Sequence, residues 1–215
     1  MQPYFVPYAG YFRLFAAADT FVVLDSVQFP RRGWLHRNRL VDQAGRLAWL
    51  TLPLRKGPRQ MRIADLEFSS EAPERLDVQL RRFPVFGNEA AAGHPLVRLL
   101  TEFAVTPVHY LERLLRECCC ILELPFNVVR ASEIERLDGL RRQDLMIGIA
   151  KSLRATEYVN LAGARALDLY DAAEFRRHGI QLHFLEDHRG PVESILGRLL
   201  AGPAEPIRQE ILANV

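Results

Sequence analysis

The chain has 215 residues, of which 49% are hydrophobic and 25% charged, and its formal net charge is +2. These values are typical of a globular protein and exclude a wholly disordered or fibrous chain. A chain of this size buries roughly 70% of its unfolded surface, so its fold needs no disulfide or metal. No apolar run reaches the roughly 18 residues of a membrane span. The residues after Met1 show no secretory pattern, so we expect a cytoplasmic protein.

Strands and helices are predicted to alternate along the first quarter of the chain. Residues 2–6 are apolar and aromatic and predict a first strand, and residues 11–18 predict a helix. Residues 20–29 are rich in β-branched and aromatic side chains, which favours a second strand covered on both faces. A loop rich in arginine, glycine and asparagine follows. Residues 47–54 then predict a third strand.

The middle of the chain carries a helical pattern. Residues 62–68 alternate in polarity and predict an edge strand. Residues 74–124 are punctuated by prolines, which predicts several helices rather than one, and the clearest of these covers residues 108–122. Because residues 74–124 are too long for a single crossover connection, we predict that they form an insertion or a cap over one end of the sheet.

The last ninety residues return to alternation. Strands are predicted at residues 127–131, 157–161 and 180–185, and helices at residues 138–153 and 195–200. Together the elements predict one α/β domain over the whole chain, with a Rossmann-like three-layer arrangement and a mainly parallel sheet. Ligands of such sheets bind beyond the carboxyl ends of the strands. The segments that follow the first and second strands are therefore the expected site.

Neither a metal nor a cofactor is predicted. The three cysteines, Cys118, Cys119 and Cys120, are adjacent and lack the paired spacing of zinc sites, so we interpret them as part of a buried helix in a reducing compartment. No Walker loop, GxGxxG, GxSxG or HExxH motif occurs in the chain.

The charge of the chain is unevenly distributed. Residues 28–62 hold nine positive side chains and one negative, a local net charge of +8, while the rest of the chain is net acidic. Such a field indicates an anionic ligand, because arginine grips phosphate and carboxylate groups in a bidentate manner. The alternative is a solvated loop of a protein that uses arginine throughout.

Two segments carry side chains suited to chemistry. In the first, Tyr4, Tyr8 and Tyr11 offer ring faces and hydroxyl donors, and Gly10 at a helix start lets backbone N–H groups approach an anion. The alternative is that these rings pack in the core. The second segment, residues 25–39, concentrates carboxylate, amide, guanidinium, indole and imidazole groups, as functional loops do.

Individual residues of the second segment have candidate roles. Asp25 is a candidate general base, with an ion pair to a nearby arginine as the alternative. Arg32 and Arg37 are suited to clamp a phosphate or carboxylate, and Trp34 is suited to stack on a ring. His36 is the one histidine of the segment and a candidate proton carrier, with a solvated role as the alternative.

The chain resembles the WbqC-like protein family over nearly its whole length. The residues that carry the resemblance are Gln2-Pro-Tyr-Phe-x-Pro-Tyr-x-Gly-Tyr-Phe12, Asp19-Thr-Phe-Val, and Asp25-x-Val-Gln-Phe-x-x-Arg-Gly-Trp-x-x-Arg-Asn-Arg39. His36 stands where the family more often has asparagine. Members occur in bacterial clusters for O-antigen and other biosynthesis, where transfer of an amino acid such as glycine has been proposed. The resemblance implies these site residues: Gln2, Tyr4, Pro7, Gly10, Tyr11, Asp25, Gln28, Arg32, Trp34, Arg37 and Asn38.

The leading hypothesis is a biosynthetic transferase that moves an aminoacyl or acyl group from an activated anionic donor to an amine acceptor, an O-antigen sugar or a secondary metabolite. The catalytic candidates are Asp25, His36 and Tyr11. The other residues named above would bind substrates and anions. The alternative hypothesis is a non-catalytic module that binds a nucleotide or nucleotide-sugar. A nucleic-acid binder ranks last, because no nucleic-acid motif occurs in the chain.

Overall fold

The computed structural model describes residues 1–213 and residue 215. Its strands form three two-stranded sheets. The strands are β1 (Phe21–Val23), β2 (Arg37–Val41), β3 (Leu47–Thr51), β4 (Val128–Arg130), β5 (Glu157–Leu161) and β6 (Gln181–Leu185). β1 pairs with β4 and β5 pairs with β6, both in parallel, while β2 and β3 form an antiparallel hairpin. The fold is therefore mixed α/β, and the Rossmann-like three-layer arrangement is not confirmed.

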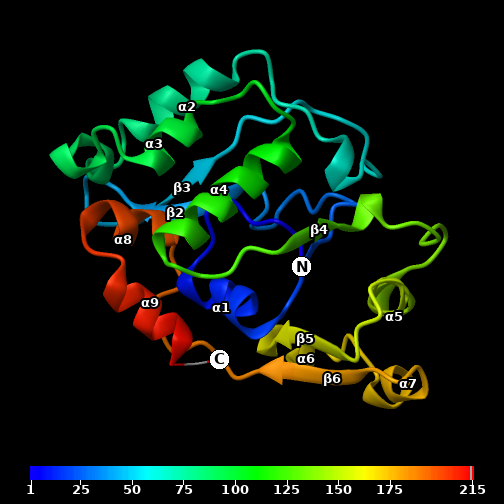
Figure 1. The fold of residues 1–215 in the computed structure, drawn as a ribbon. Helices are drawn as coiled ribbons and strands as arrows, with labels where there is room; N and C mark the ends of the chain where they lie inside the picture. Colours follow the sequence, from blue (N-terminus) through cyan, green and yellow to red (C-terminus); the bar gives the residue numbers. More distant parts are fainter. Residues whose placement is uncertain (214) are drawn as a thin grey trace.

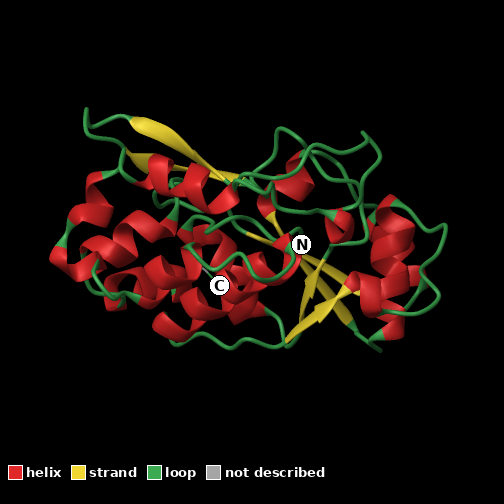
Figure 2. Ribbon diagram, turned by 90° about the horizontal axis from the view of Figure 1, so that it is seen from above, coloured by secondary structure: helices red, strands yellow, loops and turns green. Residues whose placement is uncertain are grey.

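The helices account for most of the remaining regular structure. They are α1 (Ala9–Ala17), α2 (Ala72–Leu80), α3 (Pro95–Leu100), α4 (Pro107–Ile121), α5 (Arg142–Ser152), α6 (Ala162–Ala166), α7 (Ala172–Arg177), α8 (Ile195–Ala201) and α9 (Glu205–Leu212). Figure 1 shows α4 in the middle of the molecule, with α2 and α3 on one side of it and α1 on the other. Figure 2 shows the hairpin at the upper left, apart from the parallel strands near the N-terminus.

Prolines set the starts of the helices in the middle of the chain. Pro73, Pro95 and Pro107 each occupy the first or second position of α2, α3 or α4, where the missing proline N–H leaves no hydrogen bond unmade. The prediction of several helices between residues 74 and 124 is thereby confirmed. The prediction that these helices form an insertion or cap stays a prediction, and their apolar faces belong to the main core.

Four sequence predictions differ from the structure. No strand covers residues 2–6, and the predicted edge strand at residues 62–68 is a 3₁₀ turn, η1 (Ile63–Asp65), flanked by two isolated bridges. The sequence predicts a loop where β2 lies. Asn38 and Leu40 are buried on one face of β2, so burial alternates along the strand, but Asn38 is polar and its neighbours Arg37 and Arg39 are charged, which hides this alternation in the sequence. The strand predicted over residues 20–29 is present only as the three residues of β1.

The main core is rich in stacked aromatic rings. Phe15 of α1 stacks on Phe21 of β1 with ring centroids 4.1 Å apart, and it also stacks on Phe126 at 5.5 Å. A second, smaller cluster is built around Leu145 and Ile149 of α5 and includes Phe175 of α7. Apolar burial of this extent is the dominant stabilising term of a fold.

Candidate functional site

A cavity of about 1110 Å³ opens between the end of β3, the loop after it and α2. Its charged lining consists of Arg31, Arg55, Lys56 and Arg75, with Glu67 as the one carboxylate. The cavity therefore has a net charge of +3 when His36, which also lines it, is neutral. A hollow lined by one sign of charge concentrates ligands of the opposite sign.

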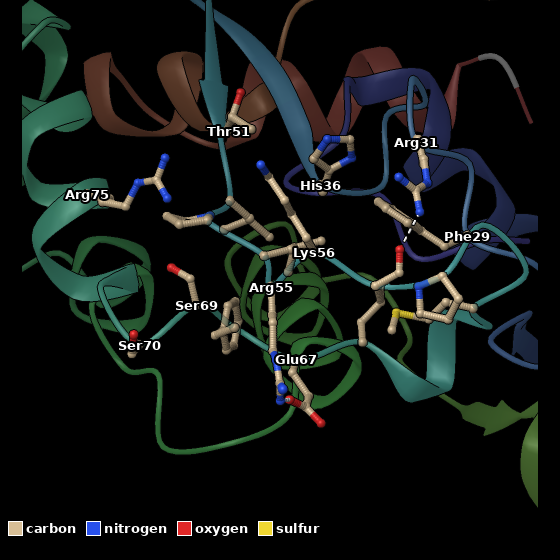
Figure 3. A pocket seen from close by; sticks show the side chains of 18 of the residues that line it. Phe29, Arg31, His36, Thr51, Arg55, Lys56, Glu67, Ser69, Ser70 and Arg75 are labelled. Atoms are coloured by element: carbon tan, nitrogen blue, oxygen red, sulfur yellow. Dashed lines mark hydrogen bonds and ion pairs between the residues drawn. The ribbon is translucent and has the colours of Figure 1, made fainter.

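Two of the four cations are uncommitted. Arg55 Nη1 lies 2.5 Å from Glu67 Oε2, and Arg31 Nη2 donates to the Gly57 carbonyl at 2.5 Å. By contrast, the side chains of Lys56 and Arg75 have no ion-pair or hydrogen-bond partner among the residues that the structure describes. Figure 3 shows the Lys56 amine reaching toward the space between Thr51 and His36, while Arg55 points away toward Glu67.

His36 is held in the wall of this cavity at the start of the hairpin. The amide of Leu52 donates to the His36 carbonyl at 2.7 Å, and the Phe29 ring meets the imidazole edge-on with centroids 5.1 Å apart. Nδ1 of His36 is buried and lacks a hydrogen-bond partner among the described residues. Burial, with the nearby charge of Arg37, lowers the pKa of His36 to about 4. The imidazole is therefore neutral at pH 7 and able to accept a proton.

A hydroxyl group also lacks a partner in the cavity. Ser69 Oγ is buried and has no hydrogen-bond partner in the described chain, although the Ser69 amide donates to the Pro53 carbonyl at 2.8 Å. Buried polar atoms are normally paired. The residues that carry the unpaired atoms, Ser69 and His36, thus line the same cavity as the uncommitted cations.

The lowered pKa of His36 gives a prediction for stability. Between pH 6.5 and about pH 4 the unfolded chain binds a proton at His36 that the folded chain does not, so this residue makes the free energy of unfolding fall as the pH drops through that window. His36→Gln should flatten this part of the curve. Urea unfolding at pH 7, 5.5 and 4.5 measures the difference. Parallel curves for the two proteins would contradict the burial of a neutral imidazole.

Of the tyrosines predicted for the site, Tyr11 lies in the interior and Tyr4 is partly buried against the core. Tyr11 is fully buried, its hydroxyl donates to the Gln2 carbonyl at 2.8 Å, and burial raises its pKa well above the usual value. The Tyr4 ring packs against it at 5.3 Å. Neither ring lines the cavity. The catalytic role of Tyr11 stays a prediction, and the contacts show a packing role.

Pro7 and Gly10 are likewise part of the packing around α1. The Pro7 carbonyl accepts a hydrogen bond from the Ile195 amide of α8 at 3.0 Å. A Cβ at Gly10 would lie 2.6 Å from Cγ of His188 and would also meet the Tyr8 ring, so glycine is required by close approach. Pro7 thus joins the first segment to α8, and Gly10 makes room for the loop that holds His188.

Asp25 and Asn38 use their polar atoms to join separate segments. Asp25 is 1% exposed, and its two carboxylate oxygens accept from the amide and the hydroxyl of Ser132 at 2.9 and 2.6 Å. Asn38 Nδ2 donates to the carbonyls of Phe5 and Val6 at 3.1 and 2.9 Å. The role of Asp25 as a general base stays a prediction. The structure shows a carboxylate that ties the end of β1 to the segment after β4.

The remaining predicted residues lie outside the cavity, and three of them, Arg32, Trp34 and Arg37, are linked to the hairpin. The Arg37 guanidinium lies 4.3 Å from the centroid of the Trp49 ring and donates to the Arg32 carbonyl at 2.9 Å. The Trp34 and Trp49 rings are 5.3 Å apart. Gln28 Nε2 donates to the carbonyl of Arg59 at 2.8 Å. None of Arg32, Trp34, Arg37 and Gln28 lines the cavity.

The cavity thus unites one predicted residue with several that sequence reasoning missed. His36 was a candidate, and Arg31, Arg55 and Lys56 belong to the basic stretch of residues 28–62 without having been singled out. Ser69 and Arg75 lie outside that stretch and carry no motif, so no local signal could have found them. Among the described residues no three His, Cys, Asp or Glu side chains are grouped to hold a metal ion.

Comparison with known proteins gives a match to one protein family. The model of the WbqC-like protein family matches residues 2–192. A curated relative is the "Uncharacterized protein Rv1507c" of Mycobacterium tuberculosis (strain ATCC 25618 / H37Rv), which is 28% identical over 174 residues, 77% of this chain and 72% of the relative. No solved structure matches the chain. No helix in the described part of the chain has the length and apolar character needed to cross a membrane.

Proposed function

The chain belongs to the WbqC-like protein family, and from this premise we propose that it is a biosynthetic transferase that moves an aminoacyl or acyl group from an activated anionic donor to an amine. One observation carries the proposal. The basic cavity beside β3 holds two uncommitted cations and a neutral, unpaired imidazole in one wall. The cations can stabilise the charged leaving group of the donor. The imidazole can take the proton that the acceptor must lose.

The cations of the cavity are suited to the donor. Lys56 and Arg75 have no partner among the described residues, so a phosphate or carboxylate of the donor can take up both charges. Apolar side chains such as Leu52 and Phe68 line the same cavity and offer a surface for the uncharged part of the donor. Pockets for small ligands commonly combine an apolar lining with a few polar groups.

The imidazole of His36 is suited to the acceptor. In the proposed step the amine nitrogen attacks the acyl carbonyl carbon and forms the new N–C bond, while the bond from that carbon to the leaving group breaks. The leaving group departs with the electron pair, and its negative charge is stabilised by Lys56 and Arg75. The proton of the amine passes to His36. A bound anion raises the pKa of a nearby imidazole, so donor binding prepares His36 to keep this proton.

The setting of the reaction follows from the family resemblance. We propose an O-antigen sugar or a secondary metabolite as the source of the amine, and the cytoplasm of a bacterium as the compartment.

A second candidate function is a module that binds a nucleotide or nucleotide-sugar without turnover. It is favoured by the small number of proton-transfer groups in the cavity. Apart from His36 the lining has one carboxylate, and Glu67 is engaged by Arg55. In such a module Lys56 and Arg75 still bind the anion, but His36 takes part in no chemical step.

Removing both uncommitted cations tests the site. The double variant Lys56→Ala with Arg75→Ala should weaken binding of the anionic donor by roughly 10- to 100-fold, which corresponds to about 1.4–2.8 kcal/mol. Calorimetric titration with nucleotides, nucleotide-sugars and acyl thioesters of coenzyme A measures the affinity, which should also fall as salt is added.

The matched control is Arg46→Ala. Arg46 lies in the hairpin loop, its side chain is 80% exposed, and it pairs with Asp42 outside the cavity. Its removal should leave donor affinity unchanged. Equal affinities for the wild type and the double variant would contradict the assignment of this cavity. Binding without turnover of any acyl donor would favour the non-catalytic module.

A further inference from the structure

The β2–β3 hairpin has one buried face and one partly exposed face. The register places three cross-strand pairs together on the exposed face, since directly paired residues share a face: Arg37 with Thr51, Arg39 with Trp49, and Val41 with Leu47. We call this the outer face. Asn38, Leu40 and Leu50 lie on the other face and are buried. On the outer face Val41 is 50% and Trp49 38% exposed. Figure 2 shows the hairpin along the upper left edge of the molecule, with helices on one side of it.

Two indole rings and two guanidinium groups are stacked at the outer face. The ring of Trp34, which precedes β2, lies beside the ring of Trp49, and the Arg37 guanidinium covers part of Trp49. The Arg39 guanidinium lies 5.3 Å from the centroid of the Trp34 ring and 5.7 Å from that of Trp49. Because a guanidinium and an indole attract each other, these contacts hold the four side chains in a defined arrangement at the surface.

The positive charges of this stack are not neutralised by carboxylates. Arg37, Arg39 and the neighbouring Arg32 form no ion pair among the residues that the structure describes. The one acidic side chain between residues 31 and 51 is Asp42, and it pairs with Arg46 in the hairpin loop at 3.8 Å. The outer face and the segment that leads into it therefore carry three uncompensated positive charges beside two aromatic rings.

We propose that the outer face binds single-stranded nucleic acid, with bases stacked on the rings of Trp34 and Trp49 and phosphates beside the guanidinium groups of Arg32, Arg37 and Arg39. Proteins that bind single strands without sequence preference combine aromatic rings, on which bases stack, with positive charges along the backbone. The face offers both in one place. A duplex is a poorer occupant because its bases are already stacked on one another, and an acidic peptide would use the charges but not the rings.

This surface is distinct from the basic cavity. Trp34, Trp49, Arg37 and Arg39 do not line the cavity, and Thr51 is the residue of the outer face that does. The proposal therefore does not depend on acyl transfer. No motif in the sequence indicates the surface, because the two indoles are far apart in the chain and only the pairing of β2 with β3 brings them together.

Fluorescence anisotropy with a labelled oligothymidylate of about 12 nucleotides tests the proposal. The logarithm of the binding constant should fall against the logarithm of the salt concentration with a slope of about −2, the value for three phosphates of a single strand. Trp49→Ala should weaken binding by roughly 5- to 100-fold, because one stacked base loses its ring. Trp49→Phe keeps a ring and should recover most of this loss. Arg39→Gln should reduce the salt slope by about 0.7.

Two controls locate the bound strand. Arg177→Gln removes an arginine of α7 that is 69% exposed and pairs with Glu174; α7 lies at the lower right of Figure 1 and the hairpin at the upper left. This variant, and the cavity variant Lys56→Ala with Arg75→Ala, should bind the oligonucleotide as the wild type does. Loss of binding in the cavity variant would overturn the proposal by placing the strand in the cavity.

Three other results would also overturn it. The first is no binding of the oligonucleotide by the wild type. The second is equal affinity of the wild type, Trp49→Ala and Arg39→Gln. The third is equal binding of a duplex, or of polyglutamate, in place of the single strand, because the face would then recognise negative charge alone.

Discussion

Replacing His36 with glutamine is expected to lower kcat by roughly 10²- to 10⁴-fold, the usual contribution of a positioned general base. Glutamine keeps a polar side chain of similar reach but cannot accept the proton of the attacking amine. The donor is held by Lys56 and Arg75, which the substitution leaves in place, so the donor affinity should stay nearly constant. Steady-state kinetics, together with calorimetric titration of the donor, separates the two quantities.

The pH profile of the wild type adds an independent readout. A general base must be unprotonated in the free enzyme, and burial lowers the pKa of His36 to about 4. The acid limb of kcat/KM should therefore lie near pH 4 rather than near the ordinary histidine value of 6.5, and it should disappear in the variant. An unchanged kcat in His36→Gln would remove the imidazole from the mechanism and leave the cavity as a binding site.

Replacing Asp25 with alanine is expected to lower the free energy of unfolding by about 2–4 kcal/mol. The substitution removes both acceptors of Ser132 and leaves its amide without a partner, and a buried donor without a partner is costly. The thermal midpoint should fall by roughly 5–15 °C. Chemical unfolding of Asp25→Ala, Ser132→Ala and the double variant gives the coupling energy between the two side chains.

The two interpretations of Asp25 predict opposite patterns. If Asp25 ties β1 to the segment after β4, the double variant is hardly less stable than Asp25→Ala alone, and activity follows the folded fraction. If Asp25 is the general base, stability changes little while kcat collapses. The second pattern would restore the catalytic role predicted from the sequence and would count against His36.

Local features of the sequence predicted several of the helices and strands. The strand predicted at residues 157–161 matches β5, and the helix predicted at residues 108–122 matches α4 to within one residue at each end. Pro107 and Thr106 define the start of that helix through a proline in its first turn and a side-chain cap. Such signals act within a few residues of the chain, so they can be recognised without knowledge of the rest of the fold.

The sequence alone also determined the family and the presence of a basic field between residues 28 and 62. The sequence could not decide which side chains of a segment rich in polar and aromatic residues face solvent, a ligand or the interior. Tyr11 and Asp25 were predicted as site residues from the sequence, but in the structure both are buried, and they are hydrogen-bonded to Gln2 and Ser132.

Only the tertiary structure brought Arg75 of α2 to the cavity of His36 and Lys56. Helices and strands follow from contacts between near neighbours in the chain. A site depends on which distant segments meet, and that is decided by the packing of the whole core.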